Sequence, residues 1–146
     1  MDKSQQIAGC VVISADDITS LLKQESKEGK RELEPLKSFS KMTKVPLNIL
    51  EDTRVVSEFE VHTQVGDLWH CIDGEVTFTL GGELIDPQIK IGKDGISDER
   101  EIRATSVRGG VENVLRAGDW LWVPPGVPHG HHTDRTGRLY IIKIPG

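Results

Sequence analysis

A short stretch near the C-terminal end of this chain joins a strand pattern to a rigid turn and a histidine. Residues 120–123 read Trp-Leu-Trp-Val, which indicates a short strand, and Pro124-Pro125-Gly126 follows at once. Pro125 fixes φ at one turn position, and Gly126 supplies the positive φ that a type II turn needs next. The backbone ahead of His129 therefore has little freedom, and rigid backbone positions a ligating side chain well.

From about residue 47 onward, short apolar stretches alternate with turn residues. We expect strands over 55–61, 67–72, 75–80, 83–85, 88–91, 101–107, 120–123 and 138–144. Gly81-Gly82 predicts a two-residue hairpin between 75–80 and 83–85. Many short strands of this kind favour an all-β fold, and a jelly-roll barrel (a double-stranded β-helix) also leaves an open interior for a ligand.

The N-terminal part of the chain has a different pattern. Residues 7–13 are rich in β-branched side chains and predict a strand, and Ser14 is a candidate cap for a short helix that ends by Gly29. Residues 30–46 carry no periodic apolar stripe and are expected to be a connecting segment over the barrel. We therefore divide the chain into residues 1–46, with a strand, a helix and a connection, and a barrel over 47–146.

The bulk properties exclude several classes of function. At 146 residues the chain is expected to be one compact unit around a single site. Its 18 basic and 23 acidic residues give a net charge of -5, which argues against a nucleic-acid partner. The sequence has no apolar stretch long enough for a membrane span or a signal peptide, so we expect no membrane partner and a cytoplasmic location. Two cysteines far apart suggest neither a disulfide framework nor a thiolate zinc cluster.

Two spaced patterns resemble the motifs of the cupin superfamily. The second cupin motif, Gly-x5-Pro-x-Gly-x2-His, is matched by Gly118, Pro124, Gly126 and His129. The resemblance covers roughly residues 47–144 and implies a cupin barrel, in which the two motifs meet. It does not name a reaction, because cupins include metal-dependent enzymes, binding modules and storage proteins.

The first cupin motif, His-x-His-x4-Glu-x6-Gly, is matched in spacing but differs in chemistry. Its four positions hold Glu60, His62, Asp67 and Gly74. Glutamate thus replaces the first histidine, and aspartate replaces the glutamate. Resemblance and donor chemistry together predict that Glu60, His62, Asp67 and His129 hold one divalent metal ion. The candidates for this ion are iron, manganese, zinc and nickel. The shorter Asp67 side chain could instead bind through water or orient a histidine, and interior polar groups can also be satisfied without any ion.

Other side chains are candidates for the cavity wall. Trp69 and Cys71 share strand parity with Asp67, and His131 shares it with His129, so we expect these three to line the interior. Cys71 could also be a small buried hydrophobic residue. The sequence does not decide whether Trp120 and Trp122 face inward or outward, and an outward pair would favour a subunit interface.

Three functions remain open on this basis. The first is a small metalloenzyme, of the oxygenase, isomerase or lyase class, acting on a small polar or carboxylated metabolite. The second is a domain that binds or senses a small molecule without turnover. The third is a structural oligomer with a filled interior. The resemblance also implies a homodimer.

Overall fold

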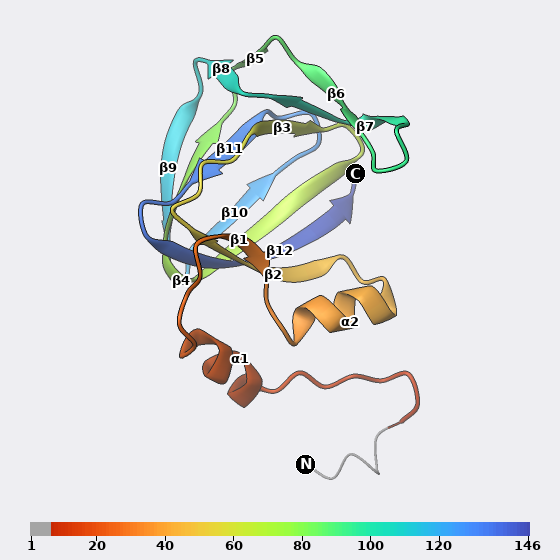
Figure 1. The fold of residues 1–146 in the computed structure, drawn as a ribbon, viewed down its shortest axis with the longest axis vertical. Coiled ribbons are helices and arrows are strands. Elements are labelled where there is room, and N and C mark those ends of the chain that lie inside the picture. The colour runs from red at the N-terminus through yellow and green to blue at the C-terminus, as the bar shows by residue number, and fades with distance from the viewer. Residues whose placement is uncertain (1–6) are drawn as a thin grey trace.

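The computed structural model describes residues 7–146, in which a 10-stranded antiparallel sheet curls on itself (Figure 1). This confirms the prediction of an all-β jelly-roll barrel. In chain order the elements are α1 (Ala15–Leu22), β1 (Gly29–Glu32), α2 (Leu36–Thr43), β2 (Leu47–Thr53), β3 (Phe59–His62), β4 (Val65–Leu80), β5 (Glu83–Ile85), β6 (Gln88–Ile91), β7 (Ser97–Ala104), β8 (Ser106–Arg108), β9 (Val111–Arg116), β10 (Trp120–Val123), β11 (His129–His132) and β12 (Thr136–Pro145).

The long strand β4 links the two halves of the curled sheet. Its first half pairs with β10 and β12, and its second half pairs with β9 and β11. The change of partners falls near Gly74, which has a φ of 69° and where a Cβ atom would lie 2.0 Å from the carbonyl oxygen of Thr136. Only glycine fits this bend. The predicted strands 67–72 and 75–80 are therefore one continuous strand.

Two hydrophobic clusters stabilise the fold. The interior of the barrel is packed by Leu50, Trp69, Cys71, Val76, Phe78, Leu115, Val123, Leu139 and Ile141. The second cluster lies where α1 and α2 meet the sheet, and its buried members are Leu21, Leu33, Leu36 and Ile49. The helices thus cover part of the outer face of the sheet.

The N-terminal region differs in part from the prediction. The helix capped by Ser14 is confirmed, with Asp17 completing a capping box, but it ends at Leu22 rather than near Gly29. The strand expected over residues 7–13 is wrong, because the chain turns at Ala8 and Gly9, side chains such as Ile7 (73%) are exposed, and no strand within residues 7–146 pairs with this segment.

The connecting segment expected over residues 30–46 is largely ordered secondary structure. β1 pairs with β2, and α2 buries Leu36 in the second cluster, so the sheet begins upstream of residue 47. The helix α2 escaped prediction because its N-cap is Pro35, which makes no side-chain capping bond. None of the helices in residues 7–146 is long and apolar enough to span a bilayer.

Two further details concern the strand edges. Gly81-Gly82 does not close the predicted hairpin, because β5 pairs with β8 instead of β4. The tryptophans of β10 face outward, since Trp120 and Trp122 are 61% and 47% exposed. Trp120 stacks on His70 of β4, with 3.8 Å between ring centroids, so His70 lies on the outer face as its strand parity predicts.

Candidate metal centre

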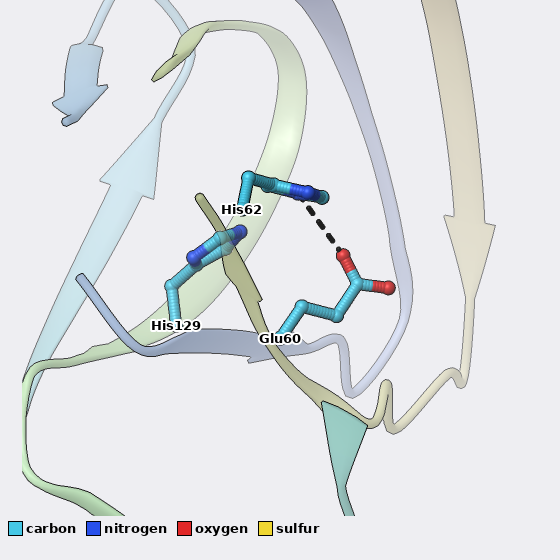
Figure 2. Close-up of side chains that lie close together, drawn as sticks. All are labelled: Glu60, His62 and His129. Atoms are coloured by element: carbon cyan, nitrogen blue, oxygen red, sulfur yellow. Dashed lines mark ion pairs between the residues drawn. The ribbon is translucent and has the colours of Figure 1, made fainter. Parts of the chain in front are cut away.

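The pairing of three strands brings the two sequence motifs together. Glu60 on β3 is directly opposite His129 on β11, and the side chains of Glu60, His62 and His129 point toward one another (Figure 2). Gly130 on β11 permits this close approach, because a Cβ atom there would lie 2.7 Å from the ring of Phe59. The turn ahead of His129 also has the expected geometry, since Gly126 has a φ of 84°.

Three of the four predicted ligands form one compact donor group. Glu60, His62 and His129 each offer a donor atom, and these atoms all lie within 4.8 Å of one another. Asp67 is not a member of that group. Its Oδ2 nevertheless lies 3.2 Å from His129 Nε2 and 3.4 Å from His62 Nε2, so it faces both imidazoles.

Hydrogen bonding on the far side of each ring sets which nitrogen faces the site. The Nδ1 of His129 lies 3.0 Å from the carbonyl oxygen of Val127, and it must donate there. The Nδ1 of His62 lies 3.3 Å from Glu101 Oε1, which is directly opposite in the β3–β7 pairing. Each imidazole therefore turns Nε2 inward, as in metal sites where an outer carboxylate or carbonyl fixes the tautomer.

The geometry of the donors fits a bound cation. Donors about 2.1 Å from a metal ion lie about 3.0 to 3.4 Å from each other in octahedral or tetrahedral coordination. The separations of His62 Nε2 from Glu60 Oε2 and from Asp67 Oδ2 are 3.3 and 3.4 Å. Moreover, His129 Nε2 and Asp67 Oδ2 are buried and make no hydrogen bond within residues 7–146. The two carboxylates bring negative charge to the two inward Nε2 atoms. Their charge must be balanced by a positive charge at the site.

A lysine supplies one positive charge at this site. Lys143 is directly opposite Asp67 in the β4–β12 pairing, and its Nζ lies 2.7 Å from Asp67 Oδ1. The same Nζ lies 3.2 Å from His62 Nε2. The ammonium group therefore neutralises Asp67 and also borders the donor group.

In the metal-free protein a proton on His62 supplies the second charge. Burial disfavours the imidazolium, but contacts with the carboxylates of Asp67 and Glu60 outweigh burial and raise the pKa of His62 to about 9. Burial likewise opposes ionisation of Glu60, whose pKa is nevertheless lowered to about 2 by His62. Asp67 is also buried, yet His129, His62 and Lys143 hold its pKa below its usual range.

These shifts predict a pH dependence for the stability of the metal-free protein. Because the pKa of His62 rises on folding, its contribution is fully present below pH 6.5 and is lost as pH rises through 9. The loss is roughly 3 kcal/mol at full deprotonation. Urea unfolding in EDTA at pH 6, 8 and 10 measures the free energy of unfolding at each pH. In the variant H62Q this free energy should change less with pH. Equal pH profiles for the two proteins would contradict the prediction.

A cavity of about 520 Å³ adjoins the donor group and is lined by Glu60, Asp67 and His129 among others. Two of the three predicted wall residues, Trp69 and His131, also line it. Cys71 does not line the cavity. Its side chain is fully buried in the hydrophobic core, where the Sγ lies 3.6 Å from the carbonyl oxygen of Asp73, so it has the alternative role of a small buried residue.

Sequence reasoning missed three charged residues near the site. Glu101 orients His62, Lys143 pairs with Asp67, and Asp52 accepts a hydrogen bond from His131. Glu101 and Lys143 each lie directly opposite a predicted ligand in a strand pair. Knowledge of the strand register would therefore have identified both. No local motif marks Asp52.

Comparisons with known proteins concern the fold. No family model and no curated protein match this chain. Similar solved structures include the CENP-C cupin domain of Drosophila melanogaster, at 14% identity and a TM-score of 0.47 over 70% of this chain and 58% of that one. Another is the ribosomal oxygenase YcfD of Escherichia coli, at 17% identity and a TM-score of 0.49 over 68% and 22%.

A third similar structure is a recombinant oxalate oxidase in complex with glycolate, at 13% identity and a TM-score of 0.49 over 80% of this chain and 50% of that one. The chain spans between 22% and 64% of the first three chains that it matches. Of these three structures, the one from Drosophila melanogaster is described as a cupin domain. At such low identity they carry no inference about activity.

Proposed function

We propose that this chain is a small metalloenzyme that binds one divalent ion through Glu60, His62 and His129. The observation that carries the proposal is the meeting of two inward Nε2 atoms with carboxylate oxygens of Glu60 and of the buried Asp67 at 3.2 to 3.4 Å. Two histidines and one carboxylate are the donor set of sites that keep coordination positions open. Asp67 completes or orients this set.

The cavity supports turnover of a small polar or carboxylated metabolite. A bound ion would act as a Lewis acid toward a substrate oxygen. The protein groups would orient the substrate, because Glu60, His129 and Asp67 all reach the wall of the cavity. A volume of about 520 Å³ suits a small molecule. The open interior argues against a structural oligomer, whereas a sensor that binds without turnover remains the second candidate, distinguished by ligand-induced stabilisation without product.

The test is a calorimetric titration of untagged, metal-stripped protein with Mn²⁺, Zn²⁺, Ni²⁺ and, without oxygen, Fe²⁺. We expect one ion per chain in the wild type. Removing a group that only orients a metal ligand lowers metal affinity about 10- to 100-fold. H62A and H129A remove a ligand itself, so each should lower the affinity by at least this factor. His132, whose strand parity is opposite to that of His129, provides the matched control H132A. A wild type that binds none of the four ions, or an H62A/H129A double variant that binds as tightly as the wild type, would overturn the proposal.

A further inference from the structure

One residue of the cavity wall, His131, forms a second titratable pair with Asp52, outside the donor group. The Nε2 of His131 on β11 lies 2.7 Å from Oδ2 of Asp52 on β2. The two residues are 7% and 0% exposed. Strands β11 and β2 belong to different halves of the curled sheet, so this contact crosses the interior of the barrel. His131 lines the cavity that adjoins the metal centre.

The contacts of His131 fix both its orientation and its tautomer. A carboxylate oxygen accepts hydrogen bonds, so this contact assigns the proton of His131 to Nε2. The ring packs against Trp69 and Phe78, at centroid distances of 5.5 and 5.1 Å. Its backbone N–H donates to Ser57 Oγ at 2.9 Å. Nδ1 therefore carries the lone pair, and no group among residues 7–146 donates to it.

A purely structural role explains this pair poorly. Burying a histidine and a carboxylate costs desolvation free energy, and apolar residues of the same volume would stabilise the core at least as well. Asp52 is fully buried, yet its Oδ1 has no hydrogen-bond partner. A histidine whose far nitrogen is held by a buried carboxylate is instead the arrangement of a general base.

Unpaired polar atoms in the same wall indicate the kind of ligand. In the described part of the chain, the buried indole Nε1 of Trp69 is a donor without a partner, and the buried Oδ1 of Asn48 is an acceptor without a partner. Both residues line the cavity. A molecule that satisfies them must offer an acceptor, such as a carboxylate or carbonyl oxygen, and a donor, such as a hydroxyl group. Small oxo or hydroxy acids and hydroxyketones meet this requirement.

We propose that His131, held by Asp52, is a general base that removes a carbon-bound proton next to a carbonyl group. The inference rests on the proposed function. The C–H bond breaks, and its electron pair remains on the substrate as the double bond of an enolate. The proton forms an N–H bond at Nδ1, and its return to carbon completes an isomerisation or an exchange. The step needs no oxidant.

The first test requires neither substrate nor metal. Nitrogen NMR of the wild-type protein with labelled histidine should show His131 with its proton on Nε2. In D52N the two tautomers should both be populated, because the amide can donate as well as accept. A wild-type proton on Nδ1 would overturn the proposal.

The second test measures proton exchange by Zn²⁺-loaded protein in D2O, with pyruvate, 2-oxoglutarate and dihydroxyacetone as probes. We expect the wild type to accelerate loss of the C–H signal of at least one probe. The variants H131Q and D52N should lower that rate by about 100-fold or more while binding Zn²⁺ as before, and H132Q should match the wild type. Zn²⁺-loaded wild type without exchange, or exchange that H131Q leaves intact, would overturn this inference alone. A wild type that binds no metal would overturn the proposed function, and the tautomer measurement would still decide the role of Asp52.

Discussion

Replacing Arg138 by methionine should destabilise the protein by roughly 3 to 5 kcal/mol, because it takes one of two arginine partners from a buried carboxylate, Glu51, and leaves only Arg31 to pair with it. Arg138 is 4% exposed, and its guanidinium lies 2.9 Å from Oε1 of the fully buried Glu51. The same group donates to Asp73 and to the carbonyl oxygens of Leu22 and Gln24, at 2.7 to 3.0 Å. One side chain therefore joins β12 to the end of α1.

Urea unfolding of R138M measures this loss of stability, and two further variants test its cause. In R138M/E51L the buried carboxylate is gone as well, so much of the stability should return. R116M removes an arginine of similar size that forms an exposed pair with Glu75, and it should change stability by less than about 1 kcal/mol. An R138M variant within 1 kcal/mol of the wild type would show that Arg31 alone satisfies Glu51. Metal binding should persist in R138M, since Arg138 touches no residue of the donor group.

The local patterns in the sequence predicted the turn ahead of His129 and the strand that leads into that turn. The turn Pro124-Pro125-Gly126 has the predicted positive φ at Gly126, and the alternation in 120–123 matches β10. These features depend on backbone preferences of a few neighbouring residues. They needed no knowledge of distant contacts.

The charged residues around the ligands depend instead on strand register. Glu101 and Lys143 stand directly across from His62 and Asp67, 39 and 76 residues away along the chain. A shift of one residue in either pairing would turn the side chain to the opposite face of the sheet. Spacing within one strand could not fix that register. The strand expected over 7–13 failed for a related reason, because β propensity alone provides no partner strand.

Replacing Lys143 by methionine should raise the affinity for a divalent ion about tenfold or more, which is ~1.4 kcal/mol. The Nζ of Lys143 lies 3.2 Å from His62 Nε2, so a dication bound at that nitrogen would lie close to the ammonium. At an effective dielectric of about 20 this repulsion amounts to several kcal/mol. The lysine is 38% exposed and can move partly into water, which reduces the expected gain. Removal of Lys143 also frees Oδ1 of Asp67, which adds a negative charge next to the ion.

Titration of metal-stripped K143M with Zn²⁺ and Mn²⁺, beside the wild type, measures the change. The control is K30M, because Lys30 lines the same cavity and carries the same charge but has no contact with Asp67 or His62 among residues 7–146. K30M should bind both ions as the wild type does. If K143M binds more weakly than the wild type, the role of the lysine is to hold Asp67 in place for the ion rather than to oppose it. Equal affinity would show that the ammonium moves away when the site is loaded, because a cation that stayed at 3.2 Å could not leave the binding free energy unchanged.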